Sequence, residues 1–269
     1  LFEIFYNGIY IEQNISKGIE YFMKAANKNH AQAQFNLGQL YINNKYIPLN
    51  INKAIYYYTL AAEQNHVHAL NNLGMIYIEG KFIQKDINKA ISYFTLAANL
   101  NLADSQYILG RLYFHNDYVP QDIKKAIFYY TLAANQNHRL ALYNLGIIYY
   151  FGNFVDCDIR KGIDYFIKAA DLGFPQAQVN VAYIYFKGKY VSRDMNKVFK
   201  YLTKAAEQGN SSALYNLGIY YYQGEFVEQN INKAIQYFVR SANLNSPMAQ
   251  HAIGIIFIEG KYVEQDISK

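Results

Sequence analysis

The sequence predicts an all-α fold, an α-α solenoid wound as a right-handed superhelix, and three observations carry that prediction. A period of 36 residues runs without an insertion through the whole chain of 269 residues. Each period contains two stretches in which apolar and small residues recur at helical spacing. Each stretch is followed by a residue type that ends helices. Two antiparallel helices per period, stacked on their neighbours, form a solenoid.

The period is visible in several columns of residues. We number the copies from the one that spans residues 31–66, so that copy two spans residues 67–102 and copy seven begins at residue 247. An alanine pair such as Ala61-Ala62 recurs in each copy until it becomes Ser241-Ala242. The lysine column is Lys17, Lys53, Lys89, Lys125, Lys161, Lys197, Lys233 and Lys269. The glycine column is Gly38, Gly74, Gly110, Gly146, Ala182, Gly218 and Gly254.

The first helix of each copy has a small-residue face. In copy two, Ala69, Leu73, Gly74 and Tyr77 step by 4, 1 and 3 residues, which places them on one side of a helix. The small members of this set permit a neighbouring helix to approach closely. Gly80 is expected to end the helix in a left-handed conformation. The same slot holds Gly8, Asn44, Asn116, Gly152, Gly188, Gly224 and Gly260.

A short loop separates the first helix from the second. In copy two it runs over residues 81–85, and its aromatic residue, Phe82, is expected to point inward. Asp86 is the expected N-cap of the second helix, because its carboxylate can accept backbone N–H groups left open there. Asp or Asn occupies that slot in every copy. The second helix is expected to end at an Asn or Gly column, which is Asn29, Asn65, Asn101, Asn137, Gly173, Gly209 and Asn245.

We therefore expect residues 1–269 to form a single solenoid of six complete helix pairs with partial repeats at both ends. Fourteen near-complete helices follow from this assignment. They are a second helix over Ile15–Asn27, the six pairs, and a last first helix over Pro247–Glu259. Both ends lie inside a repeat and carry no polar capping helix, so we expect the chain to be a segment of a longer protein.

The composition narrows the possible functions. The net charge of +5 is small and evenly spread, which argues against a nucleic-acid partner. No run of 18 apolar residues occurs, so no direct membrane span is expected. The single cysteine, Cys157, excludes an internal disulfide framework and a multi-cysteine metal site.

No set of residues indicates catalysis, a cofactor or a metal. Cys157 lies between two acidic residues, which disfavour a reactive thiolate, and no histidine is paired with it. His30, His66 and His138 share one turn slot, but neighbouring copies lie about 10 Å apart, too far for joint ligation of a metal. Glycine-rich phosphate loops and the common hydrolase motifs do not occur. We predict a chain with no catalytic residues, no cofactor and no metal site.

The lysine column needs a structural explanation. It falls at the third position of the second helix, where a cation opposes the helix dipole. We expect a nearby carboxylate or carbonyl to hold each lysine. A row of lysines could also form an anion-binding stripe, but the regular spacing favours the structural role.

The combined columns resemble the Sel-one-like repeat (SLR) family, a subfamily of the tetratricopeptide-like helical repeats. Copy two carries the pattern as Ala69-x-x-x-Leu73-Gly74-x-x-Tyr77, Gly80, Phe82, Asp86-x-x-Lys89-Ala90, Tyr93-Phe94 and Ala97-Ala98. The resemblance covers essentially the whole chain. Copy five departs from the pattern, with Ala182 in the glycine column and Val198-Phe199 for the usual Ala-Ile. The resemblance implies a non-enzymatic scaffold or adaptor that binds a protein or peptide.

The candidate binding surface is the stripe opposite the packing columns on the first helices. In tetratricopeptide-like arrays this stripe lines the concave groove, and the resemblance implies the same placement here. The stripe is apolar and aromatic in the middle copies, as interfaces often are. The predicted groove residues are Phe35, Met75, Tyr107, Arg111, Phe114, Tyr143, Ile147, Tyr150, Tyr183, Phe186, Tyr215 and Tyr222.

Other interpretations of the stripe and of the chain stay open. In a tightly wound superhelix, the same side chains would be buried against each other. The chain could be the accessory repeat region of a larger enzyme or signalling protein, such as a subunit of a kinase or ligase complex. It could also be a self-associating structural array. The sequence does not set the oligomeric state.

Overall fold

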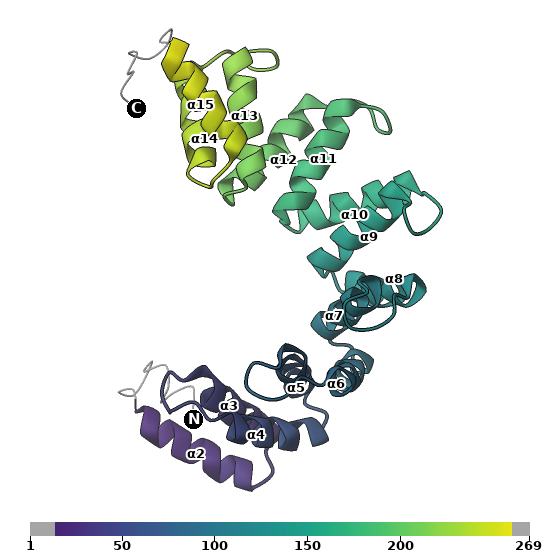
Figure 1. The fold of residues 1–269 in the computed structure, drawn as a ribbon, viewed down its shortest axis with the longest axis vertical. Helices are drawn as coiled ribbons and strands as arrows, with labels where there is room; N and C mark the ends of the chain where they lie inside the picture. The colour runs from purple at the N-terminus through teal and green to yellow at the C-terminus, as the bar shows by residue number, and fades with distance from the viewer. Residues whose placement is uncertain (1–13, 260–269) are drawn as a thin grey trace. The chain divides into compact units, whose positions relative to one another are not determined.

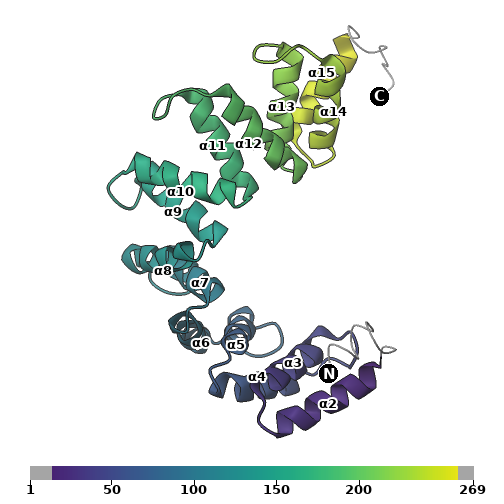
Figure 2. The ribbon, with the colours of Figure 1, turned by 180° about the vertical axis from the view of Figure 1, so that it is seen from behind.

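The computed structural model describes residues 14–259, and this part of the chain consists of fourteen α-helices without a strand (Figures 1 and 2). The helix number and the bounds of the first and last helix confirm the sequence prediction. The helices are α2 Ile15–Asn27, α3 Ala31–Asn43, α4 Ile51–Glu63, α5 Val67–Glu79, α6 Ile87–Asn99, α7 Ala103–Phe114, α8 Ile123–Asn135, α9 Arg139–Phe151, α10 Ile159–Asp171, α11 Pro175–Lys187, α12 Met195–Glu207, α13 Ser211–Gln223, α14 Ile231–Ala242 and α15 Pro247–Glu259.

The chain divides into two compact units, residues 1–136 and 137–269. The first unit contains α2 to α8, and the second contains α9 to α15. Within each unit the two helices of a copy lie side by side, as α5 and α6 do, and the second helix also packs on the first helix of the next copy, as α6 does on α7 (Figure 1). The all-α repeat fold is therefore confirmed. A single solenoid over residues 1–269 and its handedness stay predictions.

The two helices of a copy meet where a glycine faces an aromatic ring. A Cβ atom added to Gly74 would lie 2.6 Å from Cε1 of Phe94, a distance that real Cβ contacts do not reach. The ring of Phe94 has no exposed surface. Only glycine lets the backbone of the first helix rest on the ring of the second. The other pairs with this contact are Gly38–Tyr58, Gly110–Tyr130, Gly146–Phe166 and Gly218–Phe238.

Copy five shows a different solution at the same two slots. Ala182 occupies the glycine slot and Leu202 occupies the ring slot, and both side chains are 2% exposed. A methyl group on the first helix is accommodated because the partner side chain is smaller than a phenyl ring. The sequence departure at Ala182 therefore comes with a compensating change on the second helix.

The helix ends follow the sequence prediction at nearly every slot. Asp86 accepts a hydrogen bond from the backbone N–H of Lys89 at 2.9 Å, and the Asn or Asp of the other described copies caps its second helix in the same way. The Asn or Gly column after the second helix has positive φ throughout, from 59° to 83°. Gly80 has a φ of 63° and ends α5 in the left-handed conformation, as predicted. Gly8 and Gly260 lie outside the described residues.

Two local predictions are wrong. Asn116 does not adopt a left-handed conformation, because α7 ends earlier, at Phe114, and His115 continues in extended backbone. Phe82 does not point inward and is 42% exposed, with the Lys81 ammonium over its ring. The next residue, Ile83, packs on the core instead.

Buried glutamines tie adjacent copies together, and sequence reasoning missed them. Gln34 is 2% exposed, and its Nε2 donates to the carbonyl of Ala26 and to Oδ1 of Asn29. Its Oε1 accepts a 2.7 Å hydrogen bond from Nε2 of Gln64. The carbonyl at the end of one second helix is thus satisfied by the next first helix. The same glutamine pair recurs as Gln106–Gln136 and Gln178–Gln208. The alternate copies have leucine at both slots; these pairs are Leu70 and Leu100, Leu142 and Leu172, and Leu214 and Leu244.

The charged N-caps generate a prediction about pH. The hydrogen bond from the Lys125 backbone N–H lowers the pKa of the Asp122 carboxyl below its ordinary value of 3.8. A lowered carboxyl pKa adds stability that is present above pH 3.8 and is lost as the pH falls through the lowered pKa. We expect Asp122→Asn to be less stable than the wild type at neutral pH, and the difference to vanish in strong acid. Urea unfolding at a series of pH values measures it.

The chain provides a reciprocal control for this experiment. Asn50 caps α4 in the slot that Asp122 occupies before α8. Asn50→Asp should therefore gain stability at neutral pH and lose that gain in acid. A difference between Asp122→Asn and the wild type that does not change with pH would contradict this account of the cap.

Candidate functional site

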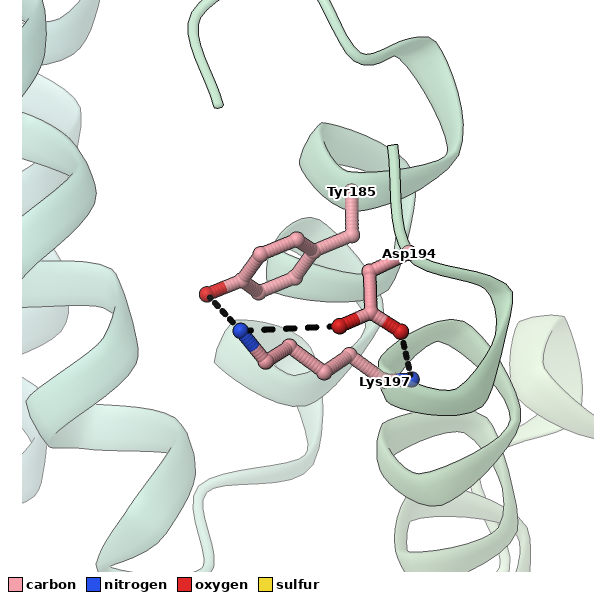
Figure 3. Close-up of polar contacts among 3 residues, drawn as sticks. All are labelled: Tyr185, Asp194 and Lys197. Carbon is pink, nitrogen blue, oxygen red and sulfur yellow. Dashed lines mark hydrogen bonds and ion pairs between the residues drawn. The ribbon is translucent and has the colours of Figure 1, made fainter. Parts of the chain in front are cut away.

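Six lysines of the column, from Lys53 to Lys233, are held by tyrosine rings. Lys269 lies outside the described residues. In copy five the Lys197 ammonium lies 4.5 Å from the ring centroid of Tyr185 and 3.4 Å from its hydroxyl oxygen (Figure 3). Asp194, whose Oδ1 accepts from the Lys197 backbone N–H, also places Oδ2 at 3.6 Å from the ammonium. The same lysine-on-tyrosine contact occurs in Lys53–Tyr41, Lys89–Tyr77, Lys125–Tyr113, Lys161–Tyr149 and Lys233–Tyr221.

These contacts correct the expectation that a carboxylate or a carbonyl holds each lysine. Asp122 and Asp194 do pair with Lys125 and Lys197, but the partner that the lysines share is a tyrosine ring. A tyrosine face attracts a cation through its quadrupole, so the lysine ties the second helix to the first. The Tyr221 hydroxyl oxygen also accepts a 2.8 Å hydrogen bond from the Lys233 ammonium, and this bond raises the pKa of Lys233 above its ordinary value. In most copies the tyrosine also stacks on a tyrosine of the second helix, as Tyr41 does on Tyr57 at 5.8 Å. The arrangement favours the structural role of the column.

The predicted groove residues lie at three slots of the first helix, those of Asn71, Met75 and Ile78. At the Ile78 slot, Phe114 and Tyr150 contact the buried ring of their own copy, at centroid distances of 6.3 Å from Tyr130 and 5.8 Å from Phe166. Residues at the Asn71 slot pack their rings against the buried ring of their own copy. The centroid distances are 5.8 Å for Phe35–Tyr58, 6.0 Å for Tyr107–Tyr130, 5.6 Å for Tyr143–Phe166 and 5.8 Å for Tyr215–Phe238. These side chains therefore extend the core toward the surface.

Phe35 is the most enclosed member of this group. It is 9% exposed and stacks on the His66 ring at a centroid distance of 4.5 Å. Burial lowers the pKa of His66, which favours the neutral ring whose Nδ1 accepts from the Ala69 backbone N–H. The structure thus gives His66, and likewise His30 and His138, a capping role that sequence reasoning missed. The other eleven predicted groove residues keep exposed surface.

Residues at the Met75 slot keep exposed surface, although Met75 also packs on the edge of the core. In the first unit, Met75 and Arg111 line a cavity of about 520 Å³ between copies two and three. Its apolar lining includes Ile78, Ile108 and Leu112, and charged residues surround that lining. In the second unit, Tyr183 occupies the same slot and is 56% exposed. The structure therefore brings together two predicted residues, Met75 and Arg111, in one surface depression.

In the second unit, aromatic residues of the loops contact residues of the predicted groove. The sequence prediction did not include these loop residues. The ring of Tyr150 makes an edge contact with Tyr190 at 6.1 Å, and the ring of Phe186 makes one with Phe226 at 6.2 Å. Tyr190 and Phe226 occupy the slot of Phe82, which the sequence analysis placed in the core. Tyr220 packs on Phe226 at 5.8 Å. The signal that could have found these residues is an aromatic at that loop slot in every copy.

The described residues include neither a metal cluster nor a membrane-spanning helix. No group of three or more His, Cys, Asp or Glu side chains within residues 14–259 is placed to share a metal ion. No helix in the same part of the chain is long and apolar enough to cross a membrane. Cys157 is exposed, and its Sγ lies 3.4 Å from the Tyr150 carbonyl oxygen.

The repeated helix pairs, with their glycine-on-ring contacts and capped ends, define an α-helical repeat protein. The Sel1 repeat model matches it at residues 1–30, 31–66, 67–102, 103–138, 139–174, 175–210, 211–246 and 247–269. The chain therefore belongs to the Sel1 repeat family. Proteins of this family are generally protein-interaction scaffolds, and their fold is typically non-catalytic.

Two solved structures show the same arrangement of helices. One is a protective antigen present in uropathogenic Escherichia coli strains that displays an SLR fold, with 26% identity and a TM-score of 0.90 over 99% of this chain. This chain spans 57% of the length of that structure. The other is a Sel1 repeat protein from Oxalobacter formigenes, with 27% identity and a TM-score of 0.77 over 98% of this chain and 78% of that chain. None of the curated proteins matches the chain.

Phe35 and Tyr183 differ in burial, so their truncation is expected to have different effects on stability. Phe35→Ala removes a buried ring, and we expect it to lower the free energy of unfolding by about 3 kcal/mol or more. Tyr183→Ala removes an exposed ring, and we expect a change of about 0.5 kcal/mol or less. Urea unfolding followed by circular dichroism measures both. Equal losses in the two variants would contradict the assignment of Tyr183 to a free surface.

Proposed function

We propose that the chain is a non-enzymatic scaffold that binds a segment of a partner protein on its first-helix face. We define this face by the outward slots of Met75 and Ile78 in each copy. In the second unit it carries Tyr150 and Tyr183, together with the loop aromatic Tyr190. The observation that carries the proposal is the edge contact between Tyr150 and Tyr190, together with the exposed ring of Tyr183.

Exposed aromatics on the second helices do not form a comparable surface. Tyr56 and Phe128 are 58% and 57% exposed, as much as Tyr183. The same slot in other copies, however, holds Ser92, Asp164, Lys200 and Gln236. Apolar residues that stand singly among polar ones are ordinary surface residues. The first-helix face is different because its aromatic slots adjoin each other across copies four and five.

Tyrosine-rich surfaces suit a protein or peptide partner. A tyrosine offers a large contact area at a low cost in conformational entropy, and its hydroxyl can bond a partner backbone. Burial, with Tyr190 as a further cause, raises the pKa of the Tyr150 hydroxyl, so that group stays a neutral donor and acceptor at physiological pH. The alternatives are an accessory repeat region of a larger enzyme or signalling protein and a self-associating array.

Affinity capture with paired variants tests the proposal. The wild type, a Tyr150→Ala/Tyr183→Ala variant and a Tyr56→Ala/Phe128→Ala variant are used as baits, and captured proteins are quantified by mass spectrometry. We expect the first-helix variant to lose its specific partners and the second-helix variant to keep them, because only the former removes adjoining contact residues. Both variants should retain the wild-type helical content, and Tyr150→Ala/Tyr183→Ala should lower the melting temperature only slightly, through loss of the Tyr150 contact with the buried Phe166 ring at 5.8 Å.

The outcome distinguishes the interpretations. Partners lost equally from both variants, or kept by both, would contradict the placement of the binding surface. A large fall in the melting temperature of the Tyr150→Ala/Tyr183→Ala variant would show that these rings belong to the core. Light scattering of the wild type over a range of concentrations tests self-association, and a constant monomer mass would exclude the self-associating array.

A further inference from the structure

The end of α11 and the loop after it carry an unusual combination of charge and aromatic rings. Residues 183–193 contain Lys187, Lys189 and Arg193 and no acidic residue. The same stretch contains the rings of Tyr183, Tyr185, Phe186 and Tyr190. All of these residues lie within the second unit. We call Lys187, Lys189 and Arg193 the cation triad.

Aromatic rings hold each member of the triad in place. The Arg193 guanidinium lies 5.1 Å from the ring centroid of Phe186 and 4.9 Å from that of Phe226. The Lys187 ammonium lies 5.4 Å from the ring of Tyr183, and the Lys189 ammonium lies 5.0 Å from the ring of Tyr190. Ring contacts restrict these long side chains, so less entropy is lost when they bind a ligand.

Carboxylates do not neutralise the triad within the described residues. Ion pairs such as Lys24–Glu20, Lys125–Asp122 and Lys197–Asp194 occur there, but none includes a member of the triad. Glu225 lies close enough to raise the pKa of Tyr220, after the larger effect of burial, but it makes no ion pair with Arg193. A guanidinium that lies beside two rings still presents its N–H edge, which suits a carboxylate.

The fold does not require cations at these slots. The slot of Arg193 holds Leu49, Gln121, Cys157 and Gln229 in four other copies, and Lys85 in copy two. In copies four and six the slot of Lys187 holds Phe151 and Gln223, and the slot of Lys189 holds Asn153 and Glu225. Copies one and two have lysine at the slot of Lys189, as Lys45 and Lys81. The same helix pair therefore forms with neutral or acidic residues in all three slots. Copy five is free to use them for a ligand.

We propose that the cation triad binds an acidic stretch of the partner protein, with carboxylates at the triad and an apolar or aromatic side chain on the rings of Tyr150, Tyr183 and Tyr190. This inference rests on the proposed function and names the chemistry of the partner. Bidentate pairing with Arg193 fixes the orientation of the stretch, and the adjoining rings supply the apolar contact.

A short acidic peptide fits the charge pattern better than a nucleic acid. A nucleic-acid strand needs a continuous row of cations along its phosphates. The corresponding slots of copy six hold Gln223 and Glu225, and those of copy four hold Phe151 and Asn153. The positive charge therefore ends on both sides of copy five. A partner with a few carboxylates matches that limited extent.

Peptide selection with the whole chain tests the proposal. Phage that display random twelve-residue peptides are selected on the wild type, on Lys187→Gln/Lys189→Gln/Arg193→Gln, and on the control Lys168→Gln/Lys200→Gln/Lys204→Gln. The control removes three exposed cations from second helices of the same unit. We expect Asp and Glu to be enriched on the wild type and the control but not on the triad variant. The best selected peptide should bind the triad variant at least tenfold more weakly in fluorescence anisotropy.

Each result has a definite meaning. Neutral or basic selected peptides, the same acidic peptides on the triad variant, or no enrichment at all would overturn the inference. Binding of a fluorescein-labelled twelve-nucleotide oligothymidylate that exceeds the binding of the best peptide would overturn it in favour of a nucleic acid. If Tyr150→Ala/Tyr183→Ala loses its captured partners while the triad variant keeps them, the proposed function stands and the acidic chemistry fails. If both variants keep them, both proposals fail.

Discussion

The contact between a glycine of the first helix and an aromatic ring of the second is the constraint on which the repeat depends. In five described copies the ring lies where a Cβ atom on the first helix would clash, at 2.5 to 2.6 Å. This contact sets how closely the two helices approach, and that spacing positions the neighbouring columns. The alanine pair meets the next copy, and the lysine of the second helix reaches the tyrosine of the first. The Ala182 and Leu202 pair shows that the volume shared by the two slots, rather than glycine itself, is what the packing requires.

Because packing uses one side of each first helix, the other side is free to vary from copy to copy. The tyrosines illustrate the division. Tyr41 and Tyr57 stack on each other between the two helices of copy one. Tyr183, in contrast, is exposed at a slot that holds Met75 in copy two and Arg111 in copy three. The framework gives every copy the same shape, and the variable slots give each copy its own surface. This separation of roles explains how a repeat of one design can present an apolar cavity in one place and a cation triad in another.

Much of the fold follows from the sequence, because the same local signal recurs in every copy. The N-cap at Asp86, the left-handed Gly80 and the bounds of α2 and α15 were all predictable from residue types and spacing. The buried Gln34 was not, since a glutamine at a helical position normally indicates a solvated side. Its partner is 30 residues away, at Gln64, and only the structure brings them together. The prediction for Phe82 was wrong for a related reason. A loop lacks the helical periodicity that shows whether a side chain faces the core. For the same reason, the sequence did not indicate that Tyr190 and Phe226 belong to the candidate site.

A double-mutant cycle on Gly74 and Phe94 tests the central constraint most directly. Gly74→Ala should destabilise the chain by about 1 to 3 kcal/mol through overpacking, and Phe94→Leu should also destabilise it. The double variant, which reproduces the pair found in copy five, should recover about 1 kcal/mol or more relative to the sum of the single losses. Free energies of unfolding from urea titrations give the coupling. Losses that simply add would contradict the account, because they would show that the glycine and the ring do not share one packed volume.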